Sequence, residues 1–266
     1  MSRIDDIFSG LRRDGRKALM PFVCGGYPRP GLLARILPEL ERAGASVVEV
    51  GIPFSDPIAD GPVIAAAMHE AIEAGTTPQS IFDEVRSVRD RVGIGIVAMV
   101  SVSIVHRLGG PRMFVAGAAE AGFDGFIFPD APLEESGDLL AEAGRAGCTA
   151  SLLIAPTTPP ERAANIARAS TGFVYLLARS GITGERTEAP SVGAAVETIR
   201  RETDLPIACG FGISTAEHVA AVTAVADAAI VGSALVRRMA DADDPVAAAG
   251  AFVRQLAAGL DGATGR

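Results

Sequence analysis

The sequence predicts an α/β fold, a single-domain (β/α)8 TIM barrel, on three observations. Short apolar runs alternate with helical patterns along the whole chain. Eight such runs occur within 266 residues, and eight strand-helix units in about 250 residues are typical of a TIM barrel. No G-x-G-x-x-G fingerprint opens the first predicted strand-to-helix turn. The barrel is therefore favoured over the alternative, an open doubly wound sheet.

The predicted strands are short apolar runs bounded by turn-forming or charged residues, as expected of strands buried in a parallel sheet. In chain order they are Ala18 to Cys24, Ser46 to Gly51, Ile94 to Val100, Gly125 to Phe128, Ala150 to Ile154, Phe173 to Leu177, Pro206 to Cys209 and Ala228 to Val231.

The predicted helices lie between these runs and follow the helical period of about 3.6 residues. They include Pro30 to Ala43, Pro78 to Arg91, Glu134 to Ala146, Pro160 to Ala169, Val192 to Glu202 and Thr215 to Ala224. No low-complexity stretch interrupts the alternation, so residues 1–266 are expected to form one domain.

Composition and charge exclude several classes of partner. The net charge is −8 without a basic cluster, which argues against nucleic acid and an anionic membrane. The N-terminus carries acids and lacks the apolar core of a signal peptide, and no apolar run reaches membrane-spanning length. A cytoplasmic location is therefore expected. The three cysteines are far apart and odd in number, which favours reduced thiols over a disulfide framework or a zinc site.

The run from Glu49 to Pro62, EVGIPFSDPIADGP, carries the clearest functional signal. Glu49 lies near the end of an apolar predicted strand, and a buried carboxylate is costly unless it has a function. The alternative is an acid satisfied by backbone donors. Asp56 and Asp60 follow in a loop stiffened by three prolines, and they can equally be turn formers or caps of a helix that begins near Pro62.

Residues that follow each predicted strand are further candidate site residues, because barrel active sites lie at the carboxyl ends of the strands. Glu49 ends the second strand, and Asp130 follows the fourth. The polar loop from Ala178 to Pro190 is long enough to act as a lid, or it is an ordinary surface loop.

Two glycine turns open the predicted helices after the last two strands, Gly210 to Ser214 and Gly232 to Ala234. Backbone N–H groups at such positions can bind an anion, so a phosphate site is favoured over two incidental turns.

The residues that are missing also narrow the chemistry. The one lysine, Lys17, precedes the first predicted strand and so lies at the wrong end of the barrel for a Schiff base. His69, His106 and His218 are scattered without metal-ligand spacing. Schiff-base and metal-dependent aldolase mechanisms are both disfavoured.

Four segments resemble, in order and spacing, the tryptophan synthase α-subunit family. They are the stretch around Glu49 and Asp60, the segment Tyr175 to Gly184, the Gly210 to Ser214 turn and the Gly232-Ser233 turn. The motif PFSDP-x-ADGP is highly specific, and the resemblance covers nearly the whole chain. It implies a lyase of tryptophan biosynthesis that cleaves indole-3-glycerol phosphate to indole and glyceraldehyde 3-phosphate by a retro-aldol reaction.

The resemblance also implies roles for individual residues and no cofactor in this chain. Glu49 is then the general acid/base, and Asp60 pairs with the indole N–H. The remaining implied roles are a ring pocket of Phe22, Tyr175 and Phe211, positioning of Asp60 by Thr183, and phosphate binding by Gly184, Gly212, Gly232 and Ser233. For Tyr175 and Phe211 the alternative is core packing.

The chain departs from the family pattern after the third predicted strand, where Ser101-Val102-Ser103 stands in place of a Tyr-x-Asn. Ala65 and Tyr27 replace residues that are often Gln and Asp. Three hypotheses follow: an α subunit working with a pyridoxal-phosphate β subunit in a hetero-oligomer, a stand-alone indole-releasing lyase, or a non-catalytic regulatory partner of a β subunit. Retention of both Glu49 and Asp60 counts against the third.

Overall fold

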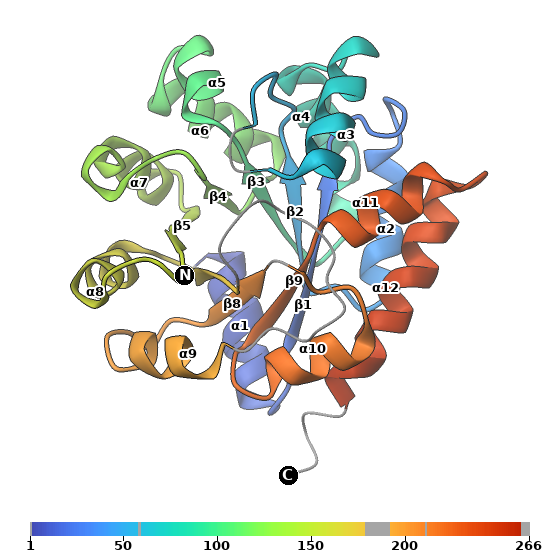
Figure 1. Ribbon diagram of the computed structural model, residues 1–266. Coiled ribbons are helices and arrows are strands. Elements are labelled where there is room, and N and C mark those ends of the chain that lie inside the picture. Colours follow the sequence, from blue (N-terminus) through green and yellow to red (C-terminus); the bar gives the residue numbers. More distant parts are fainter. Residues whose placement is uncertain (1, 58–59, 179–191, 211, 262–266) are drawn as a thin grey trace.

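The computed structural model describes residues 2–57, 60–178, 192–210 and 212–261. Within these ranges, parallel strands form a central barrel that helices surround (Figure 1). The strands are β1 Ala18–Cys24, β2 Val47–Gly51, β3 Gly95–Met99, β4 Gly125–Ile127, β5 Thr149–Ser151, β6 Leu153–Ile154, β7 Val174–Leu177, β8 Ile207–Gly210 and β9 Ala228–Val231. The predicted barrel fold is confirmed.

The helices follow the strands along the chain. They are α1 Arg3–Arg13, α2 Leu33–Arg42, α3 Pro62–Glu73, α4 Pro78–Val88, α5 Val102–Arg107, α6 Pro111–Ala121, α7 Gly137–Arg145, α8 Pro160–Ala169, α9 Gly193–Arg200, α10 Ala216–Thr223, α11 Ser233–Ala240 and α12 Pro245–Asp261, with short 3-10 turns at Arg89–Arg91 and Leu133–Glu135.

The barrel is closed by chain continuity at Leu152. The sheet order β5-β4-β3-β2-β1-β9-β8-β7-β6 leaves β5 and β6 at its two edges, but only Leu152 separates these strands in the chain. The N–H of Leu152 donates to the Oγ of Ser170 at 3.2 Å instead of to a neighbouring strand. The predicted run from Ala150 to Ile154 is therefore one barrel strand whose pairing is interrupted, and the eight predicted runs account for the nine described strands.

Two apolar layers result from the alternation of side chains along each strand. In β1, Ala18 and Met20 belong to a cluster inside the barrel, whereas Leu19 and Val23 belong to the larger cluster between the strands and the helices. The strands are buried on both faces, which is why they appear in the sequence as continuous apolar runs.

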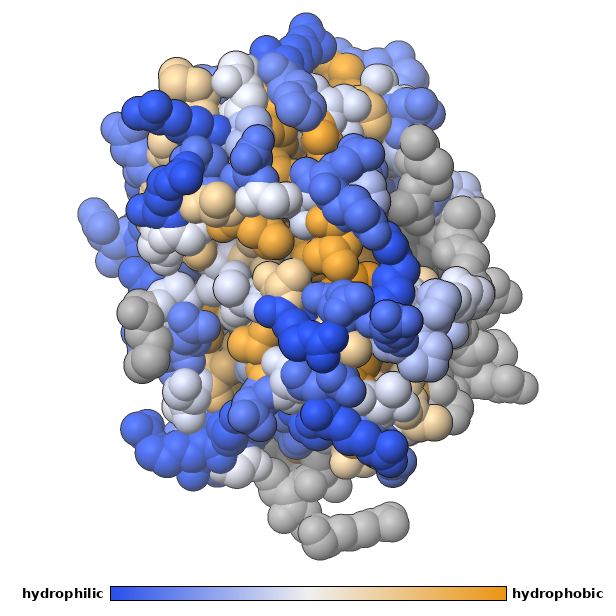
Figure 2. Space-filling model, turned by 90° about the vertical axis from the view of Figure 1, so that its left-hand side faces the viewer, coloured by the Kyte–Doolittle hydropathy of each residue, from blue (hydrophilic) through white to orange (hydrophobic). Residues whose placement is uncertain are grey.

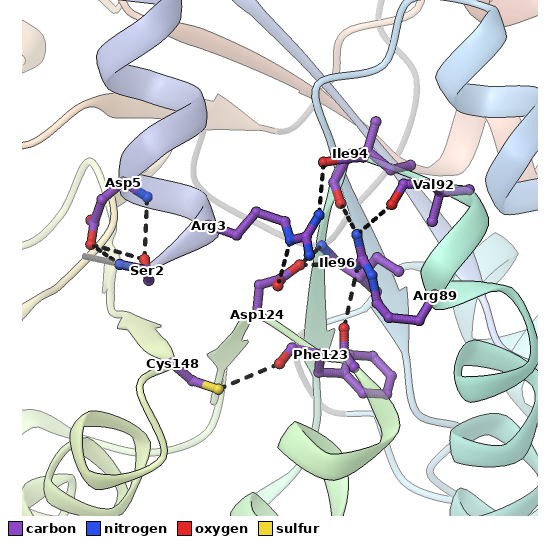
Figure 3. Close-up of polar contacts among 12 residues, drawn as sticks. Ser2, Arg3, Asp5, Arg89, Val92, Ile94, Ile96, Phe123, Asp124 and Cys148 are labelled. Atoms are coloured by element: carbon purple, nitrogen blue, oxygen red, sulfur yellow. Dashed lines mark hydrogen bonds and ion pairs between the residues drawn. The ribbon is translucent and has the colours of Figure 1, made fainter.

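Helix α1, which the sequence analysis did not predict, covers the amino-terminal end of the barrel. Its Phe8 packs against Phe173 with ring centroids 6.0 Å apart. Figure 3 shows how a charged network holds it: Asp124, directly before β4, accepts from the N–H of Ile96 at 2.9 Å and pairs with Arg3 at 3.2 Å and Arg89 at 3.1 Å. The carboxyl end of the barrel is left for the active site.

The face of the molecule seen in Figure 2 is mainly hydrophilic. Figure 2 views the side that carries α7 and α8 and shows hydrophilic side chains over much of that face, with smaller apolar areas between them. Among the described helices, none combines the length and the apolarity needed to cross a membrane.

The predicted element boundaries differ from the structure mainly at turns. The helix predicted from Pro30 begins at Leu33, because Gly31 adopts a φ of 86° that a helix does not tolerate. The helix predicted from Glu134 is a 3-10 turn followed by α7. Helices α5, α6 and α12 were not predicted, whereas α11 begins at the predicted Gly232 turn; α5 and α6 are divided by Gly109 and Gly110, both at positive φ.

Candidate active site

Glu49 lies in the middle of β2 and points into the barrel. It is two residues from Val47, a member of the inner cluster, and strand alternation puts both on the same face. Its side chain is fully buried, and neither carboxylate oxygen has a hydrogen-bond partner among the described residues. Burial raises the pKa of Glu49 from 4.5 to about 8. The interpretation that backbone donors satisfy this acid is therefore wrong for the described part of the chain.

Asp60 lies in the loop between β2 and α3. Its N–H donates to the carbonyl of Pro57 at 3.2 Å, and Gly61 occupies the N-cap position of α3. The interpretation of Asp60 as a helix cap is therefore wrong. Burial raises the pKa of its carboxyl from 3.8 to about 6, still below that of Glu49. The two acids thus have different environments and different proton affinities.

Tyr175 shares the barrel interior with Glu49. Its side chain lies in β7 and is buried, and its pKa is raised well above 10.0, first by burial and then by the charges of Glu49 and Asp60. A Cβ added to Gly210 would lie 2.6 Å from its hydroxyl oxygen, so β8 passes directly against this end of the ring. Glu49 and Tyr175 therefore face the same barrel interior, and Asp60 lies in the loop that follows β2.

Phe22 lies between the strand that carries Glu49 and the last predicted glycine turn. It is the register partner of Glu49 on the neighbouring strand β1. A Cβ added to Gly51 would lie 2.5 Å from the Cζ of this ring, and a Cβ added to Gly232 would lie 3.7 Å from its Cβ. The phenyl ring therefore fills the space between the end of β2 and the beginning of α11.

The two glycine turns occupy the ends of neighbouring strands. Gly232 is the N-cap residue of α11, and Ser233 is its buried first residue. Gly212 follows β8 with a φ of 81°. The N–H of Ser214 in the same turn donates to the Nδ1 of His218 at 3.4 Å, so this buried side chain of α10 holds the turn. The first N–H groups of a helix have no partner within it, which suits α11 for an anion.

A cavity of about 160 Å³ opens beside Asp60. It is lined by Ile52, Phe54, Asp56, Pro57, Asp60, Met68, Met99, Val100, Ser101, Pro129 and Asp130. Of these, Met68 and Met99 were not predicted, because a methionine in a helix or strand looks like any other core residue. Cys24 lies in the same buried apolar cluster as Met68, and Met99 packs against this cluster.

Three predicted site residues lie outside the described residues: Thr183, Gly184 and Phe211. The proposed lid from Ala178 to Pro190 is also outside them apart from Ala178, which is buried at the end of β7.

Lys17 lies at the amino-terminal end of the barrel, as predicted. Its Nζ donates to the carbonyl of Ala226 at 2.8 Å and lies 3.7 Å from Asp227, directly before β9. Among the described residues, no group of three or more His, Cys, Asp and Glu residues is arranged to hold a metal ion.

The buried Glu49 predicts a pH-dependent gain in stability for Glu49→Gln. Folding raises the pKa of this acid, so between pH 4.5 and about 8 the folded protein binds more protons than the unfolded chain. The wild-type free energy of unfolding therefore falls as pH rises through that window. Glutamine lacks this titration, so the variant should gain roughly 2–4 kcal/mol at pH 8 and little below pH 4.5. Urea unfolding of both proteins at pH 4.5, 6 and 8 measures the difference; a constant difference would contradict the burial of an ionisable group here.

Comparisons with known proteins give a consistent result. The sequence model of one family, described as "Tryptophan synthase alpha chain", matches residues 8–260. Proteins of that name from Synechococcus sp. (strain CC9902) and Halorhodospira halophila are each 44% identical to this chain, over 96% and 91% of its length and 96% and 89% of theirs.

Solved structures agree with the sequence comparison. Tryptophan synthase subunit alpha from Legionella pneumophila superposes with a TM-score of 0.90 at 32% identity and covers 98% of this chain and 99% of its own. A chain of tryptophan synthase from M. tuberculosis, in an aminoacrylate-bound form, gives 0.87 at 30% identity and covers 98% of this chain and all of its own.

Proposed function

This chain belongs to the tryptophan synthase alpha chain family, and on that premise we propose that Glu49 and Asp60 perform the reaction of the family. That reaction is the retro-aldol cleavage of indole-3-glycerol phosphate to indole and glyceraldehyde 3-phosphate, a lyase step of tryptophan biosynthesis. The proposal about residues rests on one observation: the fully buried Glu49 in β2 has no hydrogen-bond partner for its carboxylate among the described residues, while Asp60 in the loop after β2 lines a cavity.

The bond to be broken joins indole C3 to the first glycerol carbon, and its electrons need an acceptor. Protonation of C3 converts the ring to an indolenine, whose C=N bond accepts the electron pair as the carbon–carbon bond breaks. The hydroxyl on the departing carbon loses its proton and becomes the aldehyde carbonyl. Glu49 can donate the first proton and accept the second, so the acid ends the cycle in its starting state.

The two pKa values support this division of roles. A carboxyl with a pKa of about 8 keeps its proton at neutral pH and can donate it. A carboxyl with a pKa of about 6 is mostly ionised there and can accept a hydrogen bond from the indole N–H as positive charge develops on the ring. Two acids with separated pKa values thus suit a reaction that needs one donor and one anion.

The roles of the remaining predicted residues follow from the resemblance to the family. We assign Phe22 and Tyr175, with Phe211, to the ring pocket, and Gly212, Gly232 and Ser233, with Gly184, to the phosphate. The position of Phe22 supports a ring pocket between Glu49 and the phosphate site, because Phe22 lies between the strand that carries Glu49 and the turn before α11. Thr183 is assigned to positioning Asp60.

We propose that the chain acts as one domain, in the cytoplasm, together with a tryptophan synthase β subunit in a hetero-oligomer. The likeness to chains from structures titled tryptophan synthase supports a partner. Indole release from indole-3-glycerol phosphate, measured with and without a purified β subunit, tests both the lyase activity and the partnership with a β subunit. Release that a β subunit accelerates supports the subunit; release that no partner changes supports a stand-alone lyase; no release in either case contradicts the assigned activity.

Asp60→Asn is expected to lower kcat/KM for indole-3-glycerol phosphate about a hundredfold. The amide keeps the shape of the side chain but carries no charge to stabilise the cationic ring. Steady-state kinetics of indole release measure the change. Asp56→Asn is the matched control in the same loop, because Asp56 is exposed at the rim of the same cavity. Equal losses in both variants would argue against a specific role for Asp60.

A further inference from the structure

Asp130 joins the loops that follow two neighbouring strands. It follows β4, and its two carboxylate oxygens accept different hydrogen bonds from the segment after β3. The hydroxyl of Ser101 donates to Oδ2 at 2.6 Å, and the N–H of Val102 donates to Oδ1 at 3.0 Å. The Oγ of Ser101 in turn accepts from the N–H of Ser103 at 3.2 Å and caps α5. One carboxylate thus holds the first turn of α5 from a different loop.

Helix α5 depends on such external contacts for its position. It spans only six residues and is followed by Gly109 and Gly110, both at positive φ. A helix of this length is marginal by itself in water, so contacts with the rest of the fold decide where it lies. The hydrogen bonds of Asp130 are contacts of this kind.

We call the hydrogen bonds of Asp130 to Ser101 and Val102 the clamp. The clamp also forms one wall of the candidate active site. Ser101, Pro129 and Asp130 line the cavity that Asp60 and the apolar side chains of Met68 and Met99 complete. Ser101 is only 7% exposed, so its hydroxyl is committed to the clamp and not to solvent. Any shift of α5 relative to the β4 loop would change the width of the space beside Asp60.

We propose that Asp130 is a positioning residue that fixes Ser101 and α5 as one wall of the cavity beside Asp60, and that this cavity receives the indole ring whose N–H pairs with Asp60. It sets the affinity for the indole ring and takes no part in the proton transfers or in holding the phosphate. This inference rests on the proposed function of the cavity. It deepens that function by assigning ring affinity, separately from chemistry, to an interaction between two loops.

The test compares Asp130→Ala with Ser101→Ala and with the control Asp138→Ala, which removes an exposed acid from the first turn of α7. Steady-state kinetics give kcat and KM for indole-3-glycerol phosphate. Calorimetric titration gives the affinities for indole, which has only the ring, and for glyceraldehyde 3-phosphate, which has only the phosphate arm.

Asp130→Ala is expected to weaken indole binding and raise KM roughly tenfold, because two hydrogen bonds to a carboxylate are lost. Ser101→Ala should show a smaller change in the same direction, because the Val102 bond remains. The affinity for glyceraldehyde 3-phosphate and kcat should stay within about twofold in both variants, since the phosphate turns and Glu49 lie elsewhere. Asp138→Ala should match the wild type.

Equal weakening of indole and glyceraldehyde 3-phosphate, or unchanged indole affinity in both variants, would overturn the proposal. If Asp130→Ala does not fold, Asp130→Asn, which keeps one acceptor oxygen, and Ser101→Ala decide the matter by the same measurements. A wild-type protein that binds indole but releases none would contradict the proposed function and leave the indole titrations as the test of the clamp.

Discussion

Glu49→Gln is expected to lower kcat for indole-3-glycerol phosphate by about 10³–10⁴-fold while KM changes less than about threefold. The amide has nearly the same shape as the protonated acid, so the pocket keeps its packing. It has no proton that it can give to indole C3 and cannot accept one from the glycerol hydroxyl. Because the wild-type carboxyl already has a raised pKa of about 8, the neutral side chain is a close mimic of its resting state.

Glu39→Gln is the matched control, because it also replaces a buried glutamate but at a position outside the candidate active site. Glu39 is 8% exposed, but it lies on α2, where it pairs with Arg254 of α12 at 3.0 Å on the outside of the barrel. Its loss should reduce stability and leave kcat near the wild-type value. The two variants are therefore expected to change in opposite directions: Glu49→Gln more stable and inactive, Glu39→Gln less stable and active. Near wild-type turnover in Glu49→Gln would show that another group transfers the proton.

The barrel could be predicted from the sequence because its strands are buried on both faces. Such strands appear as uninterrupted apolar runs, and β1 and β9 were predicted with the bounds that the structure has. The interruption at Leu152 could not be predicted, since it depends on a hydrogen bond to Ser170, eighteen residues later in the chain. Helix α1 was missed although the sequence marks it locally, with a capping box between Ser2 and Asp5 and with the apolar Ile4 and Phe8 at helical spacing.

A candidate site residue could be found from the sequence where a charged residue stands within an apolar predicted strand. A glutamate within an apolar strand has few explanations, and its carboxylate oxygens have no hydrogen-bond partner in the part of the chain that the structure describes. Asp60 was ambiguous, because an aspartate before Gly-Pro is also a common way to begin a helix; only the N-cap position of Gly61 settled this. The Ser101–Asp130 clamp joins two loops through side chains, and no local pattern in the sequence indicates such a pair.

Gly212→Glu is expected to raise KM for indole-3-glycerol phosphate by about 10²–10³-fold, while the protein still folds. Gly212 follows β8 at a φ of 81°, in the turn next to Gly232 and Ser233 at the start of α11. A carboxylate there would repel a phosphate held by these turns and would compete for their N–H groups. A loss of one or two charge-assisted hydrogen bonds, each worth roughly 1.5–3 kcal/mol, gives a change of this size.

Gly212→Ala separates backbone strain from charge in this experiment. Alanine also has to adopt the positive φ, at a cost of about 1 kcal/mol, but it adds no anion. KM should therefore rise much less in Gly212→Ala than in Gly212→Glu. Indole-3-glycerol, which lacks the phosphate, provides the second comparison. Its affinity contains no contribution from a phosphate site, so a carboxylate at position 212 should affect it little. If Gly212→Glu weakens the phosphorylated and the phosphate-free compound equally, the turn after β8 packs the barrel end and does not bind phosphate. A selective loss for the phosphorylated compound would instead place the anion between the turns that follow β8 and β9.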